Sequence, residues 1–256
     1  LHVATESCMP LVVLGGSVDG RTRGLGGFQE ADQVAFAKPG CKWTAQVDST
    51  ERIPELVHLA LGKAVSGRPG GVYLDFPGQF VRRRVDDEAV PLRTGGPQVS
   101  APHPDPRMVE SIASMLASAK RPLVLVGKGA AWADATSGLT RLVGLGIPYV
   151  ASPMGRGVIA DDNPMCMNAA RSAALAGADA VLMVGGRFNW IFQFGRAPRF
   201  ATDVRLAQID IVPEEMTNAA DLEFGLVADC AAASEAISDA LTGRALATTG
   251  TGWAEE

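Results

Sequence analysis

Short apolar runs alternate with stretches of helical periodicity along most of the chain, and this pattern predicts strands separated by helices. In the second half, strands are expected at 122–126, 148–151, 180–184, 204–211 and 226–227. Helices are expected around 108–116, 133–143, 171–178 and 232–241. Strands joined by helices of about ten residues form parallel sheets that are covered on both faces. The pattern therefore predicts a doubly wound α/β fold.

The first part of the chain shows a shorter version of the same pattern. Apolar runs at 10–16 and 72–77 suit buried parallel strands. A helix is expected from Ser49, which is a candidate N-cap residue before apolar positions with helical spacing. A glycine-rich loop at 19–27 leads into Phe28-Gln29-Glu30. An aromatic ring next to an amide is able to line a pocket, although on these residues alone a plain loop is the better explanation.

The two parts are separated by residues 85–106, which have no sustained period and contain five prolines. Such a composition is typical of a semi-rigid linker. The predicted organisation is a first domain at 1–84, this linker, a second domain at 107–243 and a terminal stretch at 244–256. No internal repeat interrupts this order.

Composition narrows the class of protein. Of the 256 residues, 47% are hydrophobic and 20% are charged, which is enough apolar material for a folded core. The net charge is −5 and no long basic run occurs, so we expect no nucleic-acid partner. No apolar run approaches the roughly 20 residues of a membrane span, and no signal peptide opens the sequence. We therefore expect no membrane partner.

The cysteines and the chain ends suggest where the protein resides and what is missing from it. Four widely spaced cysteines, with no C-x-x-C pair, are typical of reduced thiols in a cytoplasmic protein. Leu1 already lies inside a helical pattern without an initiator Met, and the sequence stops shortly after Trp253. We expect a fragment of a longer protein.

Unusual residues stand at four predicted strand ends of the second domain, namely 127–129, 185–187, Asp210 and Asp229. Ligands of open parallel sheets bind at the carboxyl ends of the strands. Glycines there allow close approach of a phosphate, Arg187 is able to clamp a pyrophosphate, and Asp210 is able to accept ribose hydroxyls. Together they indicate an adenine-nucleotide site. Taken singly, each has another explanation: turn glycines, an N-capping aspartate and an arginine paired with a surface carboxylate.

Other chemistries have little support in the sequence. The three histidines have no spacing that suggests a catalytic triad or a metal site, so no metal ligand is assigned to this chain. No G-x-G-x-x-G motif follows a first strand, which argues against a hydride-transfer Rossmann domain. A non-catalytic adenine-nucleotide-binding module remains an alternative to an enzyme, because a fold alone does not establish function.

Several motifs carry a family resemblance. The segments 27–30 and 66–77 are similar to the pyrimidine-binding domain of thiamine-diphosphate enzymes of the acetolactate synthase superfamily. Five others resemble the Rossmann-like central domain of the 2-hydroxyacyl-CoA lyase and oxalyl-CoA decarboxylase family: 127–131, 153–157, 169–172, 186–190 and 208–211. Arg187-Phe-Asn-Trp190 differs from the Arg-Phe-Asp-Asp that is usual in acetolactate synthases. Phe28-Gln29 fits lyases and synthases, whereas oxalyl-CoA decarboxylases tend to have Tyr-Glu.

The resemblance implies a function and a domain assignment. Residues 1–84 would be the C-terminal half of a pyrimidine-binding domain, and 107–243 a central nucleotide-binding domain. Residues 244–256 would start the linker to a diphosphate-binding domain. The parent would be a lyase that cleaves the C1–C2 bond of a 2-hydroxyacyl-CoA to formyl-CoA and an aldehyde or ketone. Alternatives within the superfamily are oxalyl-CoA decarboxylase and an acetolactate synthase-like enzyme.

The resemblance also implies cofactors, partners and site residues. Thiamine diphosphate and Mg²⁺ would be bound mainly by groups outside this chain, because the activating glutamate would precede Leu1 and the Gly-Asp-Gly motif would follow Glu256. The fragment alone would be inactive, and the full-length enzyme would be a homodimer or homotetramer. Phe28 and Gln29 would line the catalytic pocket for the acyl-CoA. ADP or FAD would be held by Arg68, Gly129, Arg171, Arg187, Asp210, Asp229 and Cys230, although relatives often carry Ile at the last position.

Overall fold

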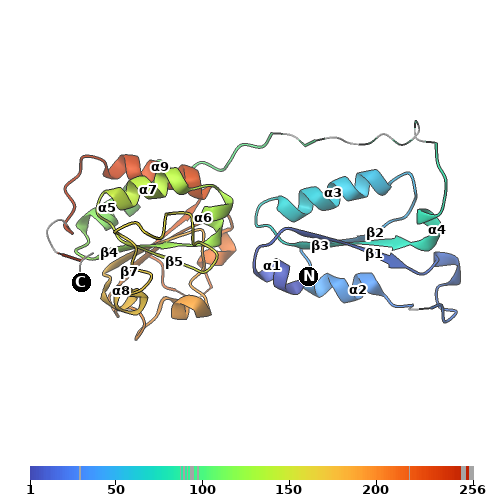
Figure 1. The fold of residues 1–256 in the computed structure, drawn as a ribbon, viewed down its shortest axis with the longest axis horizontal. Coiled ribbons are helices and arrows are strands. Elements are labelled where there is room, and N and C mark those ends of the chain that lie inside the picture. Colours follow the sequence, from blue (N-terminus) through green and yellow to red (C-terminus); the bar gives the residue numbers. More distant parts are fainter. Residues whose placement is uncertain are drawn as a thin grey trace. The chain divides into compact units, whose positions relative to one another are not determined.

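The chain forms two compact units, Leu1–Val99 and Ser100–Glu256, in the computed structural model (Figure 1). The structure describes residues 1–28, 30–86, 88, 90, 92, 95–96, 98–218, 220–248 and 252–253. Within these residues, no helix combines the length and the apolarity that crossing a bilayer requires.

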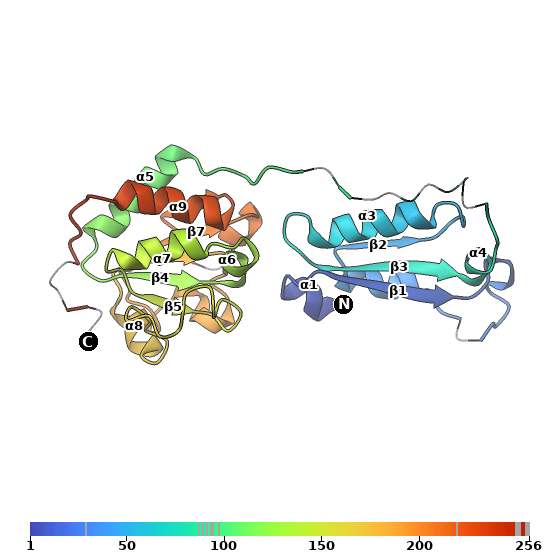
Figure 2. The same ribbon diagram turned by 45° about the horizontal axis from the view of Figure 1, so that its top comes forward.

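The first unit is built on a three-stranded parallel sheet with the order β1-β3-β2. Helix α3 covers one face, and α1 and α2 lie on the other (Figures 1 and 2). Its elements are α1 (His2–Glu6), β1 (Leu11–Ser17), η1 (Gly20–Thr22), α2 (Gln33–Ala37), η2 (Lys38–Gly40), β2 (Trp43–Gln46), α3 (Ile53–Val65), β3 (Gly71–Pro77) and α4 (Gly78–Val81).

Central strand β3 is the most deeply buried part of this unit. Val72 and Leu74 are fully buried, and they belong to the clusters that include Leu56, Ala60 and Ala64 of α3. The predicted N-cap at Ser49 is wrong, because α3 begins at Ile53 after Arg52. The Ser49 carbonyl instead accepts a hydrogen bond from the Arg52 amide, in a turn before the helix.

The second unit is built on a five-stranded parallel sheet with the order β5-β4-β6-β7-β8. Helices α5, α7 and α9 cover one face, and α8 packs on the other (Figure 1). Its elements are α5 (Pro106–Ser118), β4 (Pro122–Val126), α6 (Lys128–Trp132), α7 (Thr136–Gly144), β5 (Tyr149–Ala151), α8 (Arg171–Gly177), β6 (Ala180–Val184), η4 (Trp190–Gly195), β7 (Arg205–Asp210), η5 (Pro213–Met216), β8 (Phe224–Val227) and α9 (Cys230–Leu241).

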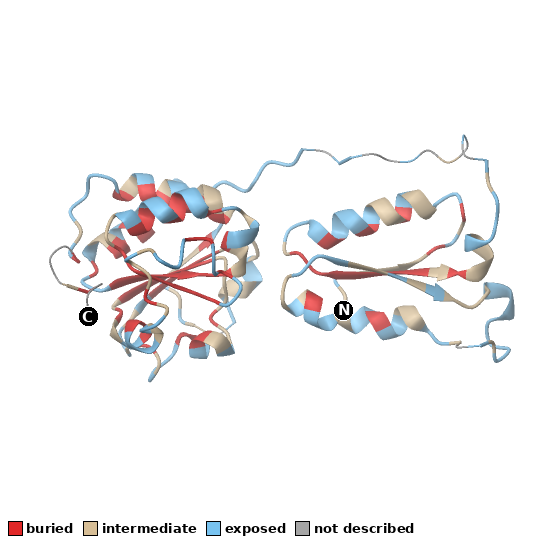
Figure 3. Cartoon of the chain, in the orientation of Figure 1, coloured by how far each residue is buried: buried red, intermediate tan, exposed pale blue. Residues whose placement is uncertain are grey.

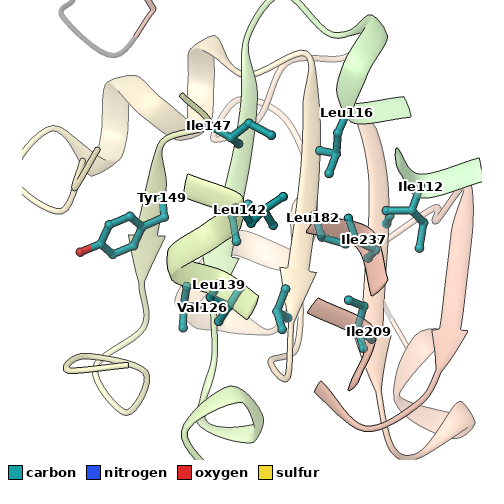
Figure 4. Packing of buried hydrophobic residues seen from close by; sticks show 14 of the residues in the cluster. Ile112, Leu116, Val126, Leu139, Leu142, Ile147, Tyr149, Leu182, Ile209 and Ile237 are labelled. Atoms are coloured by element: carbon teal, nitrogen blue, oxygen red, sulfur yellow. The ribbon is translucent and has the colours of Figure 1, made fainter. Parts of the chain in front are cut away.

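The sheet of the second unit is buried between its helices. Strands β4 and β6 are buried at every position, which explains their unbroken apolar sequences (Figure 3). On one face, Leu182 and Ile209 of the sheet belong to the same cluster as Leu139 of α7 and Ile237 of α9 (Figure 4). The predicted doubly wound α/β fold is confirmed.

The helix predicted at 133–143 is confirmed as α7, but it begins three residues later than predicted, at Thr136. The short helix α6, which ends at Trp132, precedes it. Asp134 between them has a left-handed φ of +54°, and the Ala135 amide donates back to the Ala130 carbonyl at 2.9 Å. This is the geometry in which helices commonly end. Helix α5 begins at Pro106, the last residue of the predicted linker.

Candidate functional site

The carboxyl ends of four neighbouring strands form one continuous edge in the second unit. The Gly127 amide, after β4, donates to the Val184 carbonyl of β6 at 2.8 Å. The Gly185 amide donates to Ile209 of β7 at 2.9 Å, and the Ala228 amide to Asp210 at 3.1 Å. The chain also reverses its direction of winding here, because β5 and β6 lie on opposite sides of β4. The predicted strand-end residues of this unit thus follow adjacent strands at a switch point, where such sheets bind ligands.

The glycines of this edge have a structural role. The Gly129 amide donates to the Gly185 carbonyl at 2.7 Å. A Cβ atom on Gly127 would lie 2.2 Å from that carbonyl oxygen, and Gly185 itself has φ +62°. The loops after β4 and β6 therefore touch backbone to backbone, and only glycine fits between them. This packing accounts for their sequence and places the two loops side by side at the candidate site.

Asp210 and Asp229 each fix the backbone that follows their strand. Asp210 Oδ1 accepts the Val212 amide at 3.0 Å. Asp229 Oδ1 caps helix α9 by accepting the amides of Ala231 and Ala232, both at 3.0 Å. In the described part of the chain, no donor contacts Asp229 Oδ2. The capping role given as the alternative for this residue is therefore real, and it leaves one carboxylate oxygen open to a ligand.

Cys230 lies beside these two carboxylates. Its side chain is buried, and burial together with the negative charges of Asp210 and Asp229 raises the pKa of the thiol to about 12. The thiol is therefore protonated at neutral pH and is a poor nucleophile. Cys230 is therefore a small buried side chain packed near both acidic residues.

Arg187 lies at the same edge and contacts a partner that the sequence did not reveal. Its Nη1 is 3.8 Å from Oε1 of Glu215, whose side chain is only 9% exposed. The Nε2 of buried Gln208 donates to the Glu215 carbonyl at 3.3 Å. Arg187 thus has a largely buried acidic neighbour, which holds its guanidinium in place.

A cavity of about 180 Å³ opens beside this pair. Its lining consists of Arg187, Phe188, Asn189, Phe194, Gln208, Glu215, Met216, Asn218, Ala220 and Leu222. Among the described residues, this lining includes neither Asp210 nor Asp229. A crevice shared by Arg187 and both aspartates therefore stays a prediction.

Arg171 begins α8 and is held over an aromatic ring. Its Nη2 donates to the Ile191 carbonyl at 2.8 Å, and its guanidinium carbon lies 4.6 Å from the ring centroid of Phe192. Burial and the nearby charge of Arg199 lower the pKa of Arg171. Sequence reasoning identified Arg171 only by resemblance and did not identify Arg199.

The remaining predicted site residues lie in the first unit. Phe28 is 87% exposed on the glycine-rich loop, whereas Gln29 lies outside the described residues. Arg68 follows α3, and its Nε donates to Cys8 Sγ at 3.0 Å. Arg68 is therefore a first-unit residue, unlike the other predicted nucleotide ligands.

Glu30 shapes the loop that carries Phe28. Its carboxylate accepts the amides of Gly24 and Gly27, and these two hydrogen bonds lower the pKa of Glu30. A shallow cavity of about 550 Å³ is lined by Glu30 together with Arg23, Gly24, Gly26, Gly27, Ala31 and Asp32. The sequence signal for the loop-stabilising role of Glu30 is a carboxylate directly after a glycine-rich loop.

A buried acid that the sequence analysis missed joins the three strands of the first unit. Asp75 of β3 is 1% exposed and accepts hydrogen bonds from Ser17 at 2.7 Å, Gln46 at 2.5 Å and Tyr73 at 3.1 Å. Burial and the neighbouring Asp75 raise the pKa of Tyr73 to about 12. An aspartate inside an apolar run was the available signal. The described residues contain no group of three or more His, Cys, Asp or Glu side chains that could hold a metal ion.

Comparisons with known proteins agree with this geometry. The family model of the thiamine pyrophosphate enzyme central domain matches residues 109–237. Human 2-hydroxyacyl-CoA lyase 1 is 38% identical over 218 residues, which are 84% of this chain and 37% of the relative. Oxalyl-CoA decarboxylase of Escherichia coli K12 is 35% identical over 238 residues, which are 91% of this chain and 42% of the relative. The chain thus spans well under half the length of these curated relatives.

A solved structure supports the fold. An X-ray structure from Mycobacterium smegmatis, described as that of a thiamin diphosphate-dependent enzyme, superposes with a TM-score of 0.76. The similarity covers 95% of this chain and 48% of the other, with 20% sequence identity. At that identity the likeness establishes the α/β architecture and nothing about the reaction.

Proposed function

Because this chain belongs to the thiamine pyrophosphate enzymes through their central domain, we propose that it is part of a 2-hydroxyacyl-CoA lyase. The reaction is cleavage of the C1–C2 bond of a 2-hydroxyacyl-CoA to formyl-CoA and an aldehyde or ketone. The observation that carries this proposal is the similarity to 2-hydroxyacyl-CoA lyases along most of the chain. Residues 107–243 are the central domain in this proposal, and residues 1–84 are half of a pyrimidine-binding domain.

Thiamine diphosphate, when bound, supplies an electron sink for the carbanion that the bond cleavage leaves. In this chain, Phe28 and Gln29 would line the pocket beside the reacting carbon. The exposed ring of Phe28 fits a pocket wall that other groups complete, and Glu30 supports it by holding the preceding loop. An apolar ring at this place would exclude water from the reacting centre. Ligands for Mg²⁺ lie outside residues 1–256 in this proposal.

The carboxyl edge of the second unit is proposed to hold ADP or FAD. Arg171 and Arg187 offer positive charge for phosphates, and Asp210 and Asp229 offer acceptors for hydroxyl or amino groups. The amide of Gly129 is already used by Gly185, so Gly129 contributes by having no side chain. The packed Cys230 side chain would form part of the wall. Arg68, which the resemblance adds to the nucleotide ligands, lies in the first unit, and its role in nucleotide binding stays a prediction.

The nucleotide proposal is tested by thermal unfolding of this chain with ADP or FAD. Ligand at 100 times its dissociation constant stabilises the native state by about 2.7 kcal/mol, which raises the unfolding midpoint. Arg187→Ala should lose most of that increase, and Arg141→Ala, an exposed arginine on α7, should retain it. An unchanged unfolding midpoint at millimolar ADP and FAD, with Arg187→Ala behaving like the unsubstituted chain, would contradict the proposal.

The reaction is tested on the full-length protein with thiamine diphosphate, Mg²⁺ and a 2-hydroxyacyl-CoA. Release of formyl-CoA is expected. A second candidate, oxalyl-CoA decarboxylase, is favoured by the similarity to that enzyme over 91% of the chain. It would instead release carbon dioxide from oxalyl-CoA, and an acetolactate synthase would form acetolactate from pyruvate. Nucleotide binding without any of these reactions would indicate a non-catalytic module.

The proposal extends to assembly and compartment. The full-length protein would be a homodimer or homotetramer that acts on an acyl-CoA. None of the four cysteines forms a disulfide, which supports a reducing compartment such as the cytoplasm. Sedimentation of the full-length protein distinguishes a dimer or tetramer from a monomer.

A further inference from the structure

Two arginines meet on the face of the second unit that α8 covers. Arg171 and Ser172 begin α8, and Arg199 lies on the loop between η4 and β7. The segment before α8 runs parallel to β5, with Cys166 bridged to Tyr149, and so returns the chain toward the carboxyl ends of the strands. The start of α8, with Arg171 and Ser172, therefore lies toward the carboxyl ends of the strands, and Arg199 lies beside it.

Specific contacts hold both guanidinium groups. Arg199 Nη1 donates to Ser172 Oγ at 2.8 Å. Arg171 is tied to the Ile191 carbonyl and lies over Phe192, whose ring is only 2% exposed. A guanidinium that is packed on a ring and hydrogen-bonded at one end has lost most of its side-chain freedom. Little further entropy would be lost when a ligand binds.

The positive charges of the pair are not neutralised by the protein. Among the described residues, no carboxylate forms an ion pair with Arg171 or Arg199, and the Nε atoms of both are buried without a hydrogen-bond partner. By contrast, several other arginines in the described part of the chain form ion pairs with carboxylates at the surface, as Arg205 does with Glu223. Two like charges placed together and partly desolvated favour a bound anion.

We propose that Arg171, Arg199 and the Ser172 hydroxyl form a binding subsite for a phosphoryl group. The planar, bidentate donor geometry of two guanidiniums matches phosphate oxygens, and the hydroxyl adds a neutral donor. The choice of anion rests on the proposed function, because ADP and an acyl-CoA both carry phosphoryl groups. The proposal adds Arg199 and Ser172 to the residues that bind the ligand.

Calorimetric titration of the whole chain with inorganic pyrophosphate tests the subsite. Pyrophosphate should bind the unsubstituted chain, and Arg199→Ala should weaken binding by about tenfold or more, as expected for losing a charge-assisted contact. Arg199→Lys keeps the positive charge but loses the bidentate guanidinium, so its affinity for pyrophosphate should lie between those of the unsubstituted chain and Arg199→Ala. Arg196→Ala is the matched control, because Arg196 is an exposed arginine of the same loop. The proposal would be overturned if pyrophosphate did not bind the unsubstituted chain, or if it bound Arg199→Ala equally well.

Two further variants keep the outcome interpretable. Ser172→Ala removes only the exposed hydroxyl that holds Arg199, so it should fold normally and weaken pyrophosphate binding several-fold. Arg141→Ala, which changes an exposed arginine on α7 outside the proposed site, should leave pyrophosphate binding unaffected. If ADP fails to bind while pyrophosphate depends on Arg199, the subsite stands and the nucleotide proposal falls. Titrations of ADP and of CoA into the unsubstituted chain and into Arg199→Ala then show which of the two supplies the phosphoryl group. Only the ligand whose phosphate occupies the subsite should bind Arg199→Ala more weakly.

Discussion

The sheets of the two units differ in how much of each strand is buried. In the second unit, β4 and β6 are buried from end to end and lie between helices on both faces (Figure 3). In the first unit, β1 is an edge strand on which Leu11 is 40% and Leu14 is 55% exposed. Apolar residues in the strands of the two units are thus buried to very different extents. We infer that the second unit has the more stable fold and offers a rigid support for its strand-end residues.

The largest expected effect comes from deleting a buried side chain in the second unit. Leu182→Ala in β6 removes a fully buried side chain and should lower the free energy of unfolding of that unit by about 2–5 kcal/mol. Leu14→Ala in β1 is the matched control and should cost less than about 1 kcal/mol. Urea denaturation followed by circular dichroism measures both. Equal losses would mean that the contrast in burial does not determine stability.

Two glycines provide the next comparison. A Cβ on Gly127 would lie 2.2 Å from the Gly185 carbonyl oxygen, so Gly127→Ala should cost about 1–3 kcal/mol. Gly62 lies exposed within α3 of the first unit, where a Cβ would contact nothing within 4 Å. Gly62→Ala should therefore stabilise that unit by about 0.5–1 kcal/mol, because alanine favours helix. A tolerated Gly127→Ala would show that the strand-end loops are not tightly packed.

Removing a helix cap should have a smaller effect. Asp229→Ala leaves the amides of Ala231 and Ala232 without their acceptor and should cost about 1 kcal/mol. Asn caps helices nearly as well, so Asp229→Asn should keep the stability while lowering affinity for ADP. Asp203→Ala, in an exposed loop, is the control. Thermal unfolding with and without ADP separates the cap from the ligand contact, and equal ADP affinity in Asp229→Asn would exclude a charge-dependent role.

The smallest expected effect concerns an ion pair at the surface. Arg205 contacts Glu223 through two hydrogen bonds of 2.7 Å, and this contact lowers the pKa of Glu223. The contribution is therefore present above the unfolded pKa, near 4.5, and is lost as the pH falls through the lowered folded value. Both side chains are substantially exposed, so Arg205→Ala should cost at most about 1 kcal/mol at pH 7. Urea titrations at pH 7 and pH 3 should show the difference shrinking in acid, and a constant difference would contradict this assignment.

The parts of the fold that were predictable are those that local sequence determines. Strands β4 and β6 match their predicted bounds because Pro, Gly or Ala residues delimit uninterrupted apolar runs. Strand β2 has only four residues with mixed polarity, so no apolar run marked it. The break at Asp134 depends on a left-handed backbone that an aspartate adopts only in context.

The candidate site was predictable only in outline. Parallel strands must end at one edge, so the positions of Gly129, Arg187, Asp210 and Asp229 at neighbouring strand ends followed from the pattern. Their partners did not follow from the pattern, because Glu215 lies in the short helix η5 after β7 and Arg199 lies in the loop between η4 and β7. Loop conformation decides which side chains meet, and no periodicity records it.

Amide hydrogen exchange with and without ADP tests the central claim that the carboxyl edge of the second unit is a nucleotide site on a stable sheet. Amides of β6 should exchange more slowly than those of β1. Saturating ADP should further slow exchange around Val212 and Ala231, after β7 and β8. Unchanged exchange there at saturating ADP, or faster exchange in β6 than in β1, would contradict it.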